Sequence, residues 1–172
     1  MNRLTLKNAG LIVLTALLGV YTLSLQNGFV GFDDNILLSD NPAIQEFSPR
    51  TVHYIFTSYD PELYVPLTLL TYQITHAFFG MNPTAYHILN LLLHMGSSLL
   101  VLWIAYRLSR NTMVGLLTAL LFAVHPLQVE AVSWAAGTKD VLAGSLLLAT
   151  IAAYLSWIDN GERRRYWLSV GL

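Results

Sequence analysis

The run Tyr86–Leu108, YHILNLLLHMGSSLLVLWIAYRL, decides the fold class, because it is apolar along most of its length and its only Lys, Arg, Asp or Glu is Arg107. A helix needs roughly 20 such residues to cross the hydrocarbon core of a bilayer. Three further apolar runs have the same character, at about 6–25, 110–125 and 141–158. The sequence therefore predicts an all-α polytopic membrane protein with four spans, and the start of a fifth at Tyr166.

The composition excludes several other classes of protein. Of the 172 residues, 55% are hydrophobic and 11% are charged, whereas a soluble domain carries about 25% charged residues. The nine Lys and Arg residues form no basic stripe, so we expect no nucleic-acid partner. Cysteine is absent, which excludes disulfides, thiolate catalysis and cysteine-based zinc sites.

The third apolar run is the weakest of the four, and a re-entrant loop is the alternative to a span there. The charges favour a span. With four spans and a cytoplasmic N-terminus, seven of the nine Lys and Arg residues lie inside, and only Arg50 and Lys139 lie outside. If the third run were re-entrant, the triple arginine at 163–165 would lie outside, against the positive-inside rule. The expected location is the bacterial inner membrane or the endoplasmic reticulum membrane, with the N-terminus cytoplasmic.

The outer loop 26–85 is expected to fold into short helices rather than a flexible tether. Proline follows Asn, Ser or Asp at several points in it, which is the pattern of a helix start. This pattern predicts helices at about 42–46, 49–57 and 66–79. The last is uncharged and amphipathic, so it either lies in the outer membrane interface or dips into the bilayer as a hairpin with the next span.

Asp33 and Asp34 directly follow the first span, in a segment where Gly28 and Gly31 allow tight turns. A carboxylate held at the membrane surface can act as a general base toward a hydroxyl, or can hold a cation. Neighbouring residues point in different directions, so the two acids are expected to have separate roles. Two solvated acids at a helix end are the structural alternative. Eight of the ten acids are expected on the outer side: Asp33, Asp34, Asp40, Glu46, Asp60, Glu62, Glu130 and Asp140.

The second outer loop, 125–140, ends where the fourth span begins. Gly137 is expected to close a short helix in the left-handed conformation, and the Thr138 side chain to cap the following span. Asp140 then lies in the first turn of that span, where the helix dipole alone explains an acid. Lys139 has two candidate partners, a phosphate group and lipid headgroups.

Several polar residues lie in apolar surroundings and are candidates for function. Glu130 is flanked by valine and alanine in the second outer loop. His87, Asn90 and His94 lie in the second span, where hydrogen bonds between helices are the alternative role. The two histidines alone favour a transporter as a third interpretation. Small residues of the fourth span, including Gly144, are expected to pack closely against another helix.

Five motifs occur in an order that resembles a known family: Phe32-Asp-Asp-Asn, Tyr64-Val-Pro-Leu-Thr68, the segment 82–94, the segment 125–134 and Gly137-Thr-Lys-Asp140. Together they resemble the membrane part of the transmembrane and tetratricopeptide repeat (TMTC) proteins and their bacterial relatives. That family belongs with the protein O-mannosyltransferases in the GT-C class of glycosyltransferases. The resemblance implies a GT-C-like helical bundle with short outer-face helices.

The resemblance further implies a transferase that moves mannose or another hexose from a polyprenyl-phosphate donor to a serine or threonine of an acceptor protein. The reaction inverts the anomeric carbon on the lumenal or periplasmic side of the bilayer. Asp33 or Asp34 matches the family's catalytic acid. Donor-phosphate or acceptor binding is assigned to Glu130, Lys139, Asp140, Arg50 and His125. The cofactor is left open, with a divalent cation possible.

The chain departs from the family pattern in three ways, and the first two support a second hypothesis. Val65 and Thr138 stand where the family usually has arginine, which removes cations from the outer face. The chain is also shorter than family members, so we expect a single transmembrane domain over 1–172 that is the N-terminal part of a longer protein and is inactive alone. The alternative function is a non-catalytic membrane anchor or interaction module of a tetratricopeptide-repeat protein.

Overall fold

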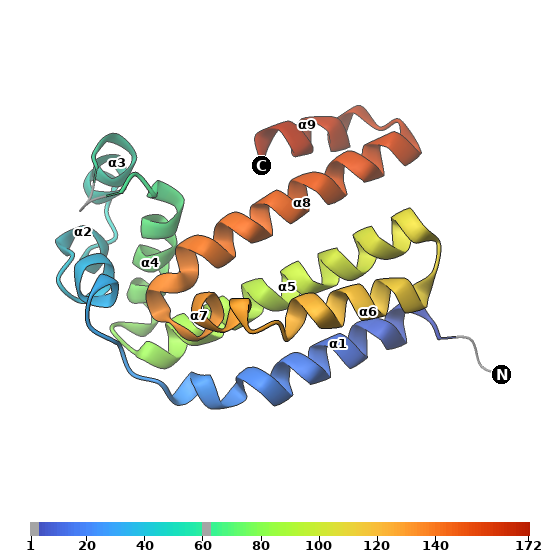
Figure 1. Cartoon of the computed structure of the whole chain (residues 1–172). Helices are drawn as coiled ribbons and strands as arrows, with labels where there is room; N and C mark the ends of the chain where they lie inside the picture. The colour runs from blue at the N-terminus through green and yellow to red at the C-terminus, as the bar shows by residue number, and fades with distance from the viewer. Residues whose placement is uncertain (1–3, 60–62) are drawn as a thin grey trace.

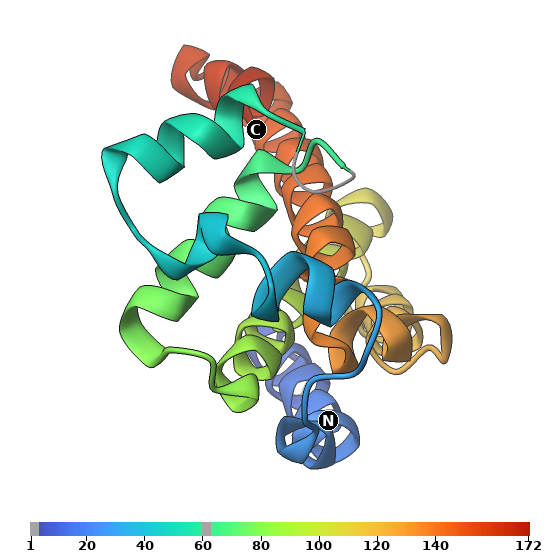
Figure 2. The ribbon, with the colours of Figure 1, turned by 90° about the vertical axis from the view of Figure 1, so that its left-hand side faces the viewer.

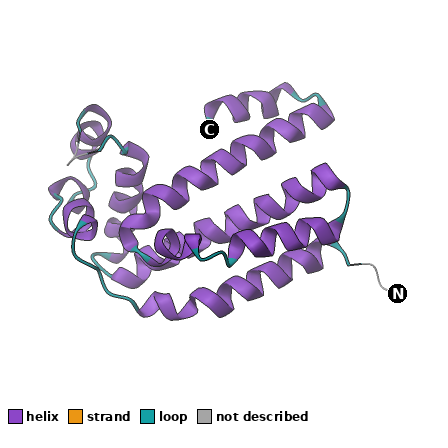
Figure 3. Ribbon diagram, viewed as in Figure 1, coloured by secondary structure: helices purple, strands orange, loops and turns teal. Residues whose placement is uncertain are grey.

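The computed structural model describes residues 4–59 and 63–172, and every regular element in these two ranges is a helix (Figure 3). Four helices run side by side along the molecule, antiparallel or parallel to one another (Figure 1). They are α1 (Leu6–Tyr21), extended by a short 3₁₀ turn at Thr22–Gln26, α5 (Pro83–Ser109), α6 (Thr112–Ala123) and α8 (Thr138–Asn160). The predicted all-α class is confirmed.

Among residues 4–59 and 63–172, three helices are long and apolar enough to cross a membrane, at Leu6–Gln26, Pro83–Ser109 and Ala135–Asn160. The predicted third span is shorter in the structure than the other three. Helix α6 has 12 residues, which is about 18 Å of helix and too short to cross alone. It joins α7 (Leu127–Ser133) at a bend of 64°, so a fourth span exists only if this bent pair is counted as one. The protein is a multi-pass membrane protein.

Helix starts follow the polar-then-proline pattern seen in the sequence. The Asn41, Ser48 and Asn82 side chains accept hydrogen bonds from backbone N–H groups of the first turns of the helices that begin at Pro42, Pro49 and Pro83. The pattern starts the outer helices α2 (Pro42–Gln45) and α3 (Pro49–Thr57). Helix α4 (Pro66–Phe79) also begins at a proline, but it follows Val65 and has no side-chain cap. The three predicted outer helices are confirmed. The predictions for Arg3, Asp60 and Glu62 fall outside the described residues.

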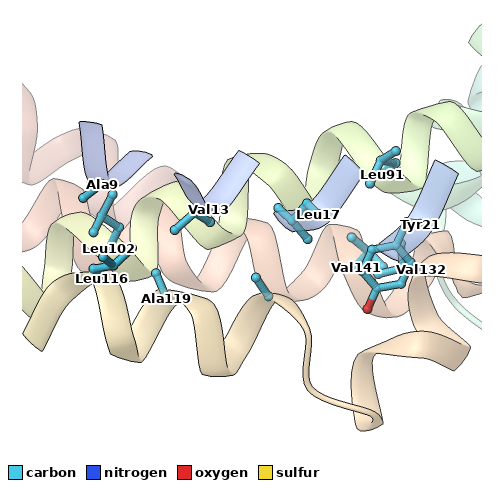
Figure 4. Packing of buried hydrophobic residues seen from close by; sticks show 11 residues of the cluster. Ala9, Val13, Leu17, Tyr21, Leu91, Leu102, Leu116, Ala119, Val132 and Val141 are labelled. Atoms are coloured by element: carbon cyan, nitrogen blue, oxygen red, sulfur yellow. The ribbon is translucent and has the colours of Figure 1, made fainter. Parts of the chain in front are cut away.

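The core of the bundle is a strip of interlocking side chains between α1, α5 and α6 (Figure 4). Ala9, Val13 and Leu17 recur every four residues on α1 and are fully buried. Gly115 of α6 packs so close to α5 that a Cβ there would lie 3.0 Å from the carbonyl oxygen of Leu102. The absence of that carbon lets the two helices approach, as small residues do between membrane helices.

The three outer helices form a second layer across one end of the bundle, and α4 runs across the spans rather than along them (Figures 1 and 2). Its polar residues Gln73 and Thr75 are buried against the protein, while Leu67, Ile74 and Phe78 are exposed. An exposed apolar face suits a helix that lies in the membrane interface. The structure therefore favours the interface placement and not the hairpin alternative.

Candidate functional site

The first outer loop turns sharply just before its two acids. Phe32 has a φ of 70°, a left-handed conformation that a bulky residue rarely adopts. After this turn Asp33 and Asp34 lead into a π-helical turn at Asn35–Ser39. The Phe32 ring is 83% exposed beside the acids. The left-handed residue of this turn is Phe32, and neither Gly28 nor Gly31 has a positive φ.

Asp34 is fully buried and joins the two outer loops. One carboxylate oxygen accepts a hydrogen bond of 2.7 Å from the Val30 N–H, and the other accepts one of 2.8 Å from the Ala136 N–H. Burial raises the pKa of the Asp34 carboxyl, and the two N–H donors offset part of this rise because they favour the ionised form. With both oxygens engaged and no exposed surface, Asp34 holds the loops together.

Asp33 lies nearer the surface and pairs with a lysine of the second loop. The Lys139 Nζ is 2.7 Å from Asp33 Oδ2, and the two side chains are 22% and 37% exposed, respectively. Lys139 also lies 5.7 Å from the centre of the Trp134 ring, within the range of a cation–π contact. Residues 106 positions apart in the sequence thus meet at one accessible ion pair.

A buried network fixes the second loop beneath this pair. The Asn90 amide donates to the Trp134 carbonyl oxygen at 2.8 Å, and its oxygen accepts from the Thr138 hydroxyl at 2.5 Å. The Thr138 hydroxyl also reaches the Ala135 carbonyl oxygen, as does the Tyr72 hydroxyl. Burial raises the pKa of Tyr72, so its hydroxyl stays a donor. The hydrogen-bonding role predicted for Asn90 is confirmed.

The predicted ending of the second loop is wrong in two respects. Gly137 has a φ of −65°, not a left-handed conformation. Glycine is needed there for space, because a Cβ would lie 2.3 Å from the Ala131 carbonyl oxygen. Thr138 does not cap α8, since its hydroxyl donates to carbonyl oxygens and accepts from no backbone N–H in the described residues. Gly144 is not closely packed either, because no atom of the described residues would lie within 4 Å of a Cβ there.

Two of the predicted binding residues are exposed and lie apart from the ion pair. Arg50, on α3, lines a separate surface groove of about 240 Å³. His125 precedes α7, and its Nδ1 accepts a hydrogen bond from the Leu127 N–H. Within residues 4–59 and 63–172 neither side chain bonds to Asp33 or Lys139.

The two acids of the second loop, Glu130 and Asp140, do not take part in the ion pair either. Glu130 is exposed on α7, and in the described part of the chain its side chain has no ion-pair partner. Asp140 is exposed in the first turn of α8 and lines a cavity of about 270 Å³ together with His94 and Gln128. His94 bonds through Nε2 to the Ala123 carbonyl oxygen at 3.0 Å, which confirms the helix-to-helix hydrogen bond expected for it.

Lys139 stands at one end of a groove between α4 and α8. The groove has a volume of about 260 Å³ and is lined mainly by apolar side chains, among them Val65, Leu142 and Leu146. Across the described residues, no three histidine or carboxylate side chains gather closely enough to hold a metal ion. The arrangement therefore offers an accessible carboxylate, one ammonium group and an apolar groove, all in contact at the same end of the bundle.

The fold and this site define a class of protein: an all-α multi-pass membrane protein whose outer loops meet at a paired acid and base. The chain is 34% identical to human protein O-mannosyl-transferase TMTC1 over 152 residues, which are 82% of this chain and 17% of the relative. It is 30% identical to human TMTC4, over 85% of this chain and 22% of the relative, and 29% identical to human TMTC3, over 86% and 17%.

The chain is TMTC-like, a homologue of these protein O-mannosyl-transferases over more than four fifths of its own length. It spans less than a quarter of the length of the three relatives. No family model matches it. No solved structure matches it either.

Proposed function

We propose that the chain contributes the outer-face site of a GT-C-type membrane glycosyltransferase, which moves mannose or another hexose from a polyprenyl-phosphate to a serine or threonine hydroxyl of a protein. The observation that carries this proposal is the accessible Asp33–Lys139 pair, 2.7 Å apart, at the head of an apolar groove. The relatives are protein O-mannosyl-transferases by name, which supports glycosyl transfer to protein. By the positive-inside rule this end faces the lumen or periplasm, with the N-terminus cytoplasmic.

Asp33 and Asp34 take different roles in this proposal, as their burial requires. Asp33 is accessible, and one of its carboxylate oxygens accepts no hydrogen bond from the described residues, so it can accept the proton of an acceptor hydroxyl. Asp34 is buried with both oxygens bonded to backbone N–H groups, so it positions Asp33 and the second loop without touching substrate.

The chemistry is a displacement at the anomeric carbon. The acceptor hydroxyl gives its proton to Asp33, and its oxygen forms a bond to that carbon from the face opposite the phosphate. The bond between the carbon and the phosphate oxygen breaks, and the electron pair leaves with the polyprenyl phosphate. Lys139 is placed to stabilise the negative charge on that leaving group.

The ion pair also holds the Asp33 carboxylate and the Lys139 ammonium group in place before the donor binds. Lys139 pairs with Asp33 at the surface, where such a pair is worth about 1 kcal/mol or less. A donor phosphate at the head of the groove competes for the ammonium group, and its arrival releases the Asp33 carboxylate for proton transfer. The groove beyond Lys139, lined by Leu142 and Leu146, is where the first isoprene units of the donor lie.

The test measures transfer of labelled mannose from a polyprenyl-phosphate donor by the whole protein. We expect Asp33→Asn to lower the rate by at least about 10²-fold, the usual contribution of a positioned base. Asp40→Asn is the matched control, because Asp40 is an exposed acid of the same loop. Transfer by Asp33→Asn at the rate of Asp40→Asn would exclude Asp33 as the base.

Lys139 is tested by donor affinity. Lys139→Gln is expected to raise the KM for the donor, and Lys139→Arg to restore most of the affinity because it keeps the charge. A chelator separates this source of positive charge from a divalent cation. Full loss of activity in chelator, regained with Mg²⁺, would assign the charge on the leaving group to a metal ion instead of Lys139.

The groove also carries one feature that favours the second function, a membrane anchor or interaction module. Val65 and Lys139 both line the groove, so among the described residues its lining has one cation where the family pattern has a further arginine. An anchor would not bind the donor lipid. Binding of polyprenyl phosphate by the purified whole protein, weakened by Lys139→Gln, would exclude this alternative.

A further inference from the structure

The end of the bundle opposite Asp33 collects positive charge, and we call it the basic end. Its described cations are Lys7, Arg107, Arg110, Arg163, Arg164 and Arg165. Two acids lie among them: Asp159 pairs with Arg107, and Glu162 pairs with Arg165 at 2.8 Å. Arg164 has no ion-pair partner among residues 4–59 and 63–172. Negative charge supplied from outside these residues is therefore favoured at this end.

A large cavity opens beside these arginines, between α5 and α8. It has a volume of about 480 Å³ and is walled mainly by apolar side chains, among them Leu100, Trp103 and Ala153. Glu162 also lines it, and its carboxylate is paired with Arg165. Helix α9 (Arg163–Gly171) folds back along α8, which brings Arg164 and Arg165 to the cavity (Figure 1). Small residues on α8 leave this space open, because an alanine cannot fill the gap that a leucine would occupy.

A second groove repeats the same pattern on the other side of Trp103. It lies between α1 and α5, has a volume of about 380 Å³ and is walled by Leu11, Leu99 and Leu102. Its cation is Lys7. The cavity and the groove thus share Trp103, and each has a positive side chain at the basic end. A molecule with two hydrocarbon chains and one negative headgroup has the shape and charge to bind there.

We propose that the basic end binds an anionic phospholipid of the adjacent leaflet, with its phosphate at Arg164 and its acyl chains against Trp103. Arginine suits phosphate because its planar fork donates two parallel hydrogen bonds to phosphate oxygens. The apolar walls lie in the part of the chain that spans the hydrocarbon, so a lipid chain replaces bulk lipid there without exposing polar groups. This site is independent of Asp33 and of the proposed transferase activity.

The test measures lipid binding by the purified whole protein. Native mass spectrometry detects the bound lipid as the protein is titrated with phosphatidylglycerol or phosphatidylcholine. We expect preferential binding of phosphatidylglycerol. Arg164→Gln is expected to weaken it about 5-fold, since a basic side chain near an anionic headgroup contributes about that factor. Arg163→Gln is the matched control, because Arg163 has the same charge and is adjacent but does not line the cavity. An equal loss for both variants would show diffuse attraction and overturn the site.

A second pair of variants tests the cavity without changing charge. Ala153→Phe fills the space beside Trp103 and is expected to reduce phosphatidylglycerol binding several-fold. Ile151→Phe, at an exposed position of the same helix outside the cavity, is expected to leave it unchanged. Unchanged binding in Ala153→Phe, or displacement of the lipid by millimolar inorganic phosphate alone, would overturn the proposal. So would the absence of bound lipid because another part of the whole protein covers the cavity.

Discussion

Replacing Asp34 by asparagine tests the claim that this acid holds the outer loops together. The wild-type carboxylate accepts two hydrogen bonds, from Val30 N–H at 2.7 Å and from Ala136 N–H at 2.8 Å. Asparagine keeps one acceptor oxygen and turns the other position into an NH₂ donor. One of the two backbone N–H groups then faces a donor in a fully buried site.

The cost of Asp34→Asn follows from these contacts. A buried N–H left without a partner costs about 1–3 kcal/mol, and the lost bond to a charged acceptor adds to this. We therefore expect a loss of about 2–4 kcal/mol. Asp33→Asn is the matched control, because it removes an accessible ion pair worth about 1 kcal/mol or less.

The assay is equilibrium unfolding of the purified whole protein in detergent micelles, together with hydrogen exchange of the peptide that contains Ala136. A local loss of 2 kcal/mol speeds exchange of the Ala136 amide by about 30-fold, if the loop opens before the bundle does. We expect Asp34→Asn to lose stability and protection, and Asp33→Asn to lose transfer activity while keeping both. Wild-type protection of the Ala136 amide in Asp34→Asn would refute the bridging role of this carboxylate.

Three further predictions concern packing and pH. Gly137→Ala is expected to destabilise the second loop by at least about 1–3 kcal/mol, since its Cβ would lie 2.3 Å from the Ala131 carbonyl oxygen; wild-type exchange protection of that loop would contradict the reason given for this glycine. Gly115→Leu is expected to separate α5 from α6 and lower the Tm, because even a Cβ would lie 3.0 Å from the Leu102 carbonyl oxygen; an unchanged Tm would argue against this close approach. The pKa of Asp34 is raised on folding, so its contribution to stability is greatest below the unfolded value of 3.8 and declines as pH rises through the folded pKa. The free energy of unfolding of the wild type minus that of Asp34→Asn should therefore fall as pH rises over that interval. A rise would mean that the N–H donors outweigh burial.

Local chemistry was enough to predict where α2, α3 and α5 begin. Asn41, Ser48 and Asn82 each precede a proline, and each side chain caps the helix that follows. These contacts join residues two or three positions apart, so they are encoded in short stretches of sequence. The start of α8 failed the same reasoning. The Thr138 hydroxyl turned toward Asn90, 48 positions away, which no local pattern specifies.

The sequence by itself determined the class of the protein and the residue types of its site. Long apolar runs cross the membrane as helices, because in lipid every backbone N–H and C=O group must find its hydrogen-bond partner within the segment. The tertiary structure alone decided which acid is accessible. Asp33 and Asp34 are adjacent and chemically alike, yet one meets Lys139 at the surface and the other meets the Ala136 N–H in the interior, at separations of 106 and 102 residues. The folded path of the backbone sets those distances, and burial of one carboxylate but not its neighbour gives the pair its two roles.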